Sequence, residues 1–163
     1  MSKASFFVAI ILLGCKISHP NKEQLPSGED QNIIYHPLRN EQDLDILLKE
    51  IGDARIVLLG ESTHGTSEYY TWRTAISKRL IQEKGFDFIA VEGDWDDCYK
   101  VNEFIKGPPQ DSTAVIRLLQ QYNRWPTWMW SNHEIASLVH WLNQYNQNKS
   151  AENKTGFYGM DVY

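Results

Sequence analysis

Apolar side chains recur at helical spacing between Glu41 and Ile51. Leu44, Leu47, Leu48 and Ile51 lie three or four positions apart and so share one helix face. Gly52 follows directly, where a glycine that caps a helix C-terminus is common. The pattern predicts a helix over residues 41–51.

Two short apolar runs flank a second helical pattern. Arg55–Leu59 (RIVLL) closes at Gly60, and Phe86–Val91 (FDFIAV) repeats the pattern. Each run is typical of a parallel strand that is buried on both faces. The stretch between them carries apolar residues at helical spacing up to Gly85, and its helix is expected to begin near Thr66 or Ser67. We therefore predict a βαβ unit with a right-handed crossover.

The rest of the chain adds helices and one more strand. Helices are predicted over residues 97–105 and 112–122 and from Ser131 onward, where Ser131 and Glu134 match a capping box. A third strand is predicted over residues 157–160, followed by Asp161. These elements indicate an α/β fold, a parallel-strand βαβ core with additional helices. Because such a domain rarely ends on a central strand, we expect a truncated fold.

The N-terminus has a different pattern. The positively charged start is followed by Phe6–Leu13 (FFVAIILL), an apolar run that is too short for a membrane span and typical of a signal peptide. Leu12-Leu13-Gly14-Cys15 resembles a bacterial lipobox. We predict a lipoprotein signal peptide over residues 1–14, lipid on Cys15, a polar tether over 15–32 and a domain over 33–163. This predicts a bacterial cell-envelope location with a membrane anchor formed by lipid only. The alternative is a small apolar helix with a buried Cys15.

Composition narrows the class of protein. The chain has 163 residues and fits one domain, and its 16 Lys and Arg against 21 Asp and Glu give a net charge of −5. This acidic balance argues against nucleic-acid binding. Lipid on Cys15 would leave Cys98 as the sole thiol, so no internal disulfide is expected.

Ionisable residues follow all three predicted strands. They are Glu61 and His64 after the first, Glu92 and Asp94 after the second, and Asp161 after the third. Alone, each would be read as a solvated loop residue or a helix cap. Because ligands bind at the carboxyl ends of strands in open α/β sheets, three successive strand ends favour a site.

The loop after the first strand, GESTHG, leaves two chemistries open. It resembles the serine hydrolase elbow G-x-S-x-G, but His64 stands where the second glycine must fit, so Ser62 is a poor nucleophile candidate. The other possible chemistry is that of a metal site formed by Glu61, His64, Glu92 and Asp161, although the H-E-x-x-H pattern of zinc hydrolases is absent.

Longer segments resemble a known family. The run GESTHGTSEYYTWRTAISKRLIQEKGFDFIAVEGDW and the later RWPTWMWSNHE and FYGMD segments are similar to those of the erythromycin esterase family. The resemblance implies hydrolysis of carboxylic esters, typically a macrolactone, with no serine or cysteine nucleophile and no cofactor. By position it implies catalytic roles for Glu61, His64, Arg73 and Glu92. It also implies a later strand with a further histidine motif, so the site in this chain is expected to be incomplete.

The residue types suit that chemistry. Histidine is the side chain best suited to deprotonate water near neutral pH, so His64 is the expected general base. Glu61 or Glu92 would orient it, and Arg73 would stabilise an oxyanion or a carboxylate. Without the resemblance, Arg73 would be taken as an exposed residue paired with Glu68 or Asp87.

The Trp-rich segment 125–130 is interpreted as packing between helices, with room for one or two rings to line a substrate cleft. The alternative function from another class is a non-catalytic surface lipoprotein that binds an apolar ligand or a partner.

Overall fold

A computed structural model of the chain describes residues 7–9, 36–60 and 62–161. Four strands form one sheet in the order β2-β1-β3-β4, and every neighbouring pair is parallel. The strands are β1 (Phe7–Ala9), β2 (Ile56–Leu58), β3 (Phe88–Asp94) and β4 (Gly156–Asp161). The predicted α/β class with a parallel sheet is confirmed. Cys15 and Glu61 lie outside the described residues.

Helices connect these strands. They are η1 (Glu41–Leu44), α1 (Asp45–Ile51), α2 (Ser67–Lys84), α3 (Trp95–Lys106), α4 (Ser112–Leu119), η2 (Thr127–Met129), α5 (His133–Asn146) and η3 (Ala151–Asn153). The predicted ends of α2 are confirmed: Thr66 precedes its first turn, and Gly85 caps it with a φ of 73° that favours glycine. Among the described residues, no helix has the length and apolar character needed to cross a membrane.

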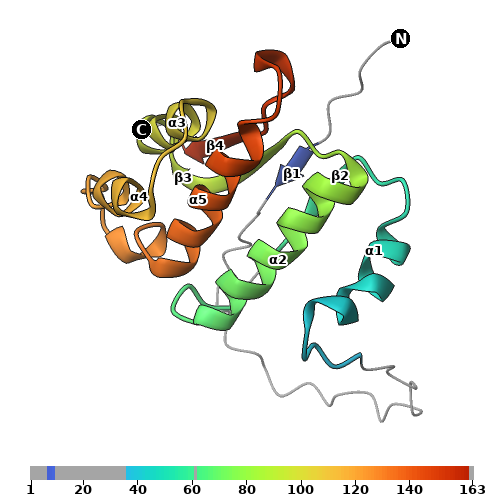
Figure 1. Cartoon of the computed structure of the whole chain (residues 1–163). Coiled ribbons are helices and arrows are strands. Elements are labelled where there is room, and N and C mark those ends of the chain that lie inside the picture. Colours follow the sequence, from blue (N-terminus) through green and yellow to red (C-terminus); the bar gives the residue numbers. More distant parts are fainter. Residues whose placement is uncertain (1–6, 10–35, 61, 162–163) are drawn as a thin grey trace, which may run out of the picture.

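One face of the sheet carries the core. Helices α2 and α5 lie side by side over it (Figure 1). Ile89 and Val91 of β3 and Phe157 of β4 point to these helices and are buried. Helix α3 packs along β4, where the Asn102 side chain accepts a hydrogen bond from the Phe157 N–H at 3.1 Å. This contact satisfies a backbone donor on the outer edge of the sheet.

The strand between β2 and β3 comes from the far N-terminus. Ala9 of β1 lies level with Leu58 on one side and with Ala90 on the other. The crossover from β2 through α2 to β3 therefore passes over one intervening strand. Strand β1 lies within the segment that the sequence analysis assigns to a signal peptide.

The expectation that the first predicted strand is buried on both faces was wrong. Ile56 and Leu58 of β2 are 59% and 56% exposed. The side chain of Val57, between them, points to the opposite face of the strand and packs against the core. Strand β2 is at the edge of the sheet, and within the described residues nothing covers its second face.

The capping box predicted for α5 was also wrong. Helix α5 begins at His133, and Asn132 caps it by accepting a hydrogen bond from the Ile135 N–H at 2.8 Å. Glu134 instead accepts a hydrogen bond from the Ser67 hydroxyl at the start of α2. That bond lowers the pKa of Glu134. The long Glu134 side chain thus joins two helices, whereas the short amide of Asn132 reaches the backbone beside it.

Buried amides of α5 fasten the end of α3. Asn143 donates to Phe104 O at 3.0 Å, and Asn146 donates to Ile105 O and Thr155 O, each at 3.0 Å. Asn146 also accepts from the Thr155 N–H at 2.8 Å. The last carbonyls of a helix lack intrahelical partners, and these amides add to the local cap in which the Gly107 N–H donates to Phe104 O at 3.2 Å. They connect α3, α5 and the start of β4.

Candidate functional site

A solvent-open cavity of about 120 Å³ lies at the carboxyl ends of β3 and β4. Glu92 and Asp94 of β3 and Asp161 at the end of β4 line it. Its other wall is the connection between α4 and α5, residues 122–130. The ends of β3 and β4 bring together carboxylates that are far apart in sequence, as predicted for these two strands.

Asp94 organises the edge of this cavity. One carboxylate oxygen accepts hydrogen bonds from the N–H groups of Asp96 and Asp97 at 2.9 and 3.2 Å and so caps α3. The other lies 3.3 Å from Arg124 Nη1. These contacts give Asp94 a positioning role, because it ties the 122–130 wall to the end of β3.

Trp130 holds the backbone at the carboxyl end of β3. Its indole N–H donates to the backbone oxygen of Glu92 at 2.7 Å. Its ring meets Phe157 edge to face, with centroids 6.4 Å apart. The backbone that carries Glu92 is therefore held by a buried side chain.

We expect Gly159→Ala to destabilise the fold at this edge. A Cβ at Gly159 would lie 2.5 Å from the backbone oxygen of Gly93, which cannot move without shifting β3. The free energy of unfolding, measured by urea titration, should fall by about 1–3 kcal/mol. Gly60→Ala is the control, because its Cβ would meet nothing within 4 Å. An equal loss in both variants would contradict the close-approach argument.

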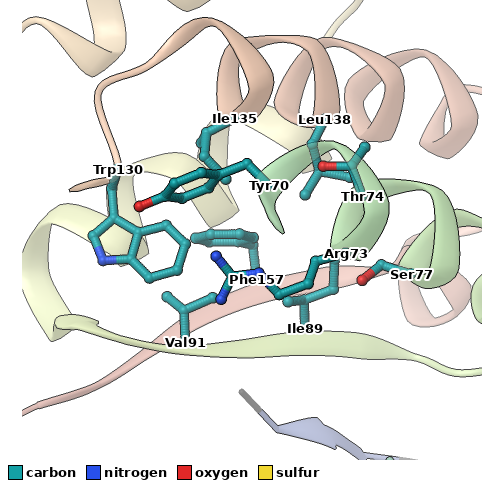
Figure 2. Close-up of a pocket in the computed structure, with 10 residues that line it drawn as sticks. All are labelled: Tyr70, Arg73, Thr74, Ser77, Ile89, Val91, Trp130, Ile135, Leu138 and Phe157. Carbon is teal, nitrogen blue, oxygen red and sulfur yellow. The ribbon is translucent and has the colours of Figure 1, made fainter. Parts of the chain in front are cut away.

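Arg73 lies in a separate, enclosed pocket under α2. Figure 2 shows its guanidinium near Val91, Phe157 and the Tyr70 ring. The residue is 8% exposed, its guanidinium carbon lies 4.9 Å from the Tyr70 ring centroid, and its Nε donates to Tyr69 O at 3.3 Å. The alternative interpretation of Arg73 as an exposed helix residue is therefore wrong. Trp130 lines both this pocket and the carboxylate cavity.

His64 is half-buried in the turn between β2 and α2. It lines neither the Arg73 pocket nor the carboxylate cavity, so the expectation that all three strand ends converge on one cleft was wrong for His64. Because β1 separates β2 from β3, and neighbouring strands lie about 4.8 Å apart, the strands that lead to His64 and to Glu92 are about 10 Å apart. The two residues are at the same edge of a parallel sheet, with a gap of two strand spacings.

The hydroxyl and thiol groups nearby are not activated. The Ser62 hydroxyl is exposed and lies 2.6 Å from the Tyr69 hydroxyl, with which it shares a hydrogen bond. Cys98 is buried below the carboxylate cavity, and desolvation raises the pKa of its thiol to about 12. Tyr122 donates a hydrogen bond to the Cys98 sulfur at 3.6 Å, and burial raises the pKa of Tyr122 as well.

Sequence reasoning missed Tyr122 and Arg124 in the outer wall of the cavity. Both lie in an irregular connection without apolar periodicity. Their place directly before the Trp-rich segment, of which Trp125 also lines the cavity, was the available signal. Among the described residues, no group of three or more His, Cys, Asp and Glu side chains is arranged to hold a metal ion. Glu61 of the alternative metal set is outside that range.

The chain is similar in sequence to one protein family and in structure to two proteins of known structure. The erythromycin esterase family model matches residues 81–163. Erythromycin esterase type II of Escherichia coli is 30% identical over 129 residues, which are 79% of this chain and 28% of that protein. A succinoglycan biosynthesis protein of known structure is 33% identical with a TM-score of 0.62, and 78% of this chain matches 31% of that one. A Bacillus cereus protein of known structure is 30% identical with a TM-score of 0.63, and 78% of this chain matches 30% of that one. The chain thus spans less than a third of the length of each relative.

Proposed function

The chain belongs to the erythromycin esterase family, and from that premise we propose that it is a hydrolase of carboxylic esters in which His64 activates water. No serine or cysteine nucleophile takes part. Glu61 or Glu92 orients the His64 imidazole, and the positive charge of Arg73 stabilises an oxyanion or a carboxylate. The substrate is a small-molecule ester, a macrolactone or a related compound.

The convergence of strand ends is the observation that carries this proposal. Glu92 and Asp161 meet in one cavity, and the His64 turn follows β2 at the same edge of the sheet. The strands that lead to His64 and to Glu92 run in the same direction on either side of β1, so both residues follow the carboxyl ends of their strands.

The state of the nucleophile candidates supports water as the attacking group. A serine nucleophile needs an adjacent base, but the Ser62 hydroxyl is bonded to the Tyr69 phenol. A cysteine nucleophile reacts as a thiolate, and the raised pKa of Cys98 keeps it a thiol near neutral pH.

The burial of Arg73 supports an electrostatic role. A guanidinium keeps its charge even when it is removed from water, and its field is stronger in a pocket of low dielectric constant. Its pocket includes Val91, the residue before Glu92. This buried positive charge near β3 supports the proposal that Arg73 favours the ionised form of groups at the end of that strand.

The test is a hydrolysis screen of the protein with macrolactones and simple aryl esters, with and without EDTA. Hydrolysis that survives EDTA and serine-directed acylating inhibitors is the expected result. Loss of activity in EDTA that zinc restores would favour the metal-dependent alternative. Saturable ligand binding without turnover would favour the non-catalytic surface lipoprotein.

We also propose that residues 1–14 are a lipoprotein signal peptide and that Cys15 carries the lipid. Cys15→Ser should then abolish lipid attachment and leave the precursor unprocessed, because the cysteine is the acceptor. Membrane fractionation and mass spectrometry of the N-terminus measure both effects. Unchanged membrane partitioning and an unchanged N-terminus would refute this proposal.

A further inference from the structure

The tryptophans of the 125–130 segment differ in their surroundings. Trp130 is 6% exposed and packs in the core, whereas Trp128 is 47% and Trp125 is 85% exposed. Of the two exposed rings, Trp125 lines the carboxylate cavity and Trp128 does not. The interpretation of this segment as packing therefore holds for Trp130 and fails for Trp125.

Solvent exposure of so large a ring at the wall of a cavity is the informative feature. A tryptophan buries about 150–250 Å² when covered, so the ring of Trp125 contributes little to the fold and can contribute much to a bound ligand. We propose that Trp125 is a specificity-determining residue that covers the apolar face of the ester bound in this cavity. This inference rests on the proposed function, because it takes the cavity as the place where the ester binds.

The neighbouring residues hold Trp125 at the rim. Arg124 Nη1 lies 3.3 Å from Asp94, which in turn caps α3. On the other side Pro126 also lines the cavity. The backbone of Trp125 is thus tied to the strand end that carries Glu92, and its ring is available to a ligand that reaches Glu92.

The charges of the lining determine the class of ester. Among the described residues, four carboxylates line the cavity, those of Glu92, Asp94, Asp97 and Asp161, against a single guanidinium, that of Arg124. A ligand with its own carboxylate would meet like charge there. The cavity therefore suits a neutral or cationic ester with a flat or ring-shaped apolar face.

Binding can be tested separately from turnover with a ketone that cannot be hydrolysed. The probes are neutral 2-acetonaphthone and its anionic partner 6-acetyl-2-naphthoate. Ligand-observed NMR measures their binding to the full chain, and ¹H–¹⁵N spectra of the labelled protein report its indole N–H groups. Trp125→Ala should weaken binding of the neutral ketone about tenfold or more, Trp125→Phe should restore most of it, and Trp128→Ala should leave it within about twofold. In the parent protein, the neutral ketone should shift the indole N–H resonance of Trp125, and the anionic ketone should bind more weakly.

Equal binding by Trp125→Ala and the parent protein, with both folded by circular dichroism, would overturn the inference, as would tighter binding of the anionic ketone. Hydrolysis of 2-naphthyl acetate by the same variants separates the two proposals. Trp125-dependent binding without hydrolysis would keep this inference and refute the esterase proposal. Hydrolysis that Trp125→Ala leaves unchanged would keep the esterase proposal and refute this inference.

Discussion

Replacement of His64 by alanine is expected to lower kcat/KM for ester hydrolysis by about 10²–10⁴, because general-base catalysis commonly contributes that factor. Without the imidazole, bulk water must act as the base. The measurement uses the complete protein and an ester that it cleaves. Circular dichroism of the variant establishes that the fold is intact.

Ser62→Ala is the matched control in the same loop. Its hydroxyl is exposed and bonded to Tyr69, so its removal should cost much less activity than the loss of His64. A serine nucleophile predicts the opposite order and a covalent adduct with an acylating inhibitor. An inactive Ser62→Ala beside an active His64→Ala would overturn the mechanism.

A large loss of stability is expected for Asn146→Ala. The side chain is fully buried, and its removal leaves Ile105 O, Thr155 O and the Thr155 N–H without the hydrogen bonds they now make to it. A buried backbone group that loses its partner costs about 1–3 kcal/mol. We therefore expect a loss of about 3–5 kcal/mol, which is a large share of the 5–15 kcal/mol that is typical of a folded domain.

Asn148→Ala provides the comparison, since Asn148 is exposed in the turn that follows α5. Its substitution should change the free energy of unfolding by no more than about 0.5 kcal/mol. Urea titrations of both variants measure the difference. Similar small losses at both positions would mean that the amide of Asn146 does not fasten α3 to β4.

The sequence pattern predicted an element correctly where the residues of that element alone determine it. Helix α2 was predicted closely because Thr66, Gly85 and the apolar spacing between them act within one segment. The capping box of α5 failed because the Glu134 side chain bonds to Ser67, 67 residues away in sequence. No pattern within a helix can report a partner at that distance.

Burial of a strand cannot be predicted from its own apolar residues. Ile56 and Leu58 have the composition of a strand covered on both faces, yet they are exposed because no described element packs on the face of β2 to which they point. An apolar run such as Phe6–Leu13 likewise suits either a signal peptide or a strand, and its periodicity does not distinguish them.

The site was predictable as far as strand ends define it. Glu92 and Asp161 were expected to converge because parallel strands end at the same edge, and they line one cavity. The exposed Trp125 and the buried Trp130 are the same residue type in one short segment, so their different surroundings follow only from the fold. The burial of Arg73 came from the packing of α2 on the sheet, which the helical pattern alone did not determine.

The place of β1 has a consequence for protein maturation. This strand pairs with β2 on one side and with β3 on the other, and among the described strands it is the one that links them. Cleavage before Cys15 would remove β1 and with it the ladder that holds β2 to the rest of the sheet. Precursor and processed protein would then differ in the core of the sheet, and amide hydrogen exchange in β2 would distinguish them. If the proposed signal removal takes place, the sheet of the processed protein would have to form without β1.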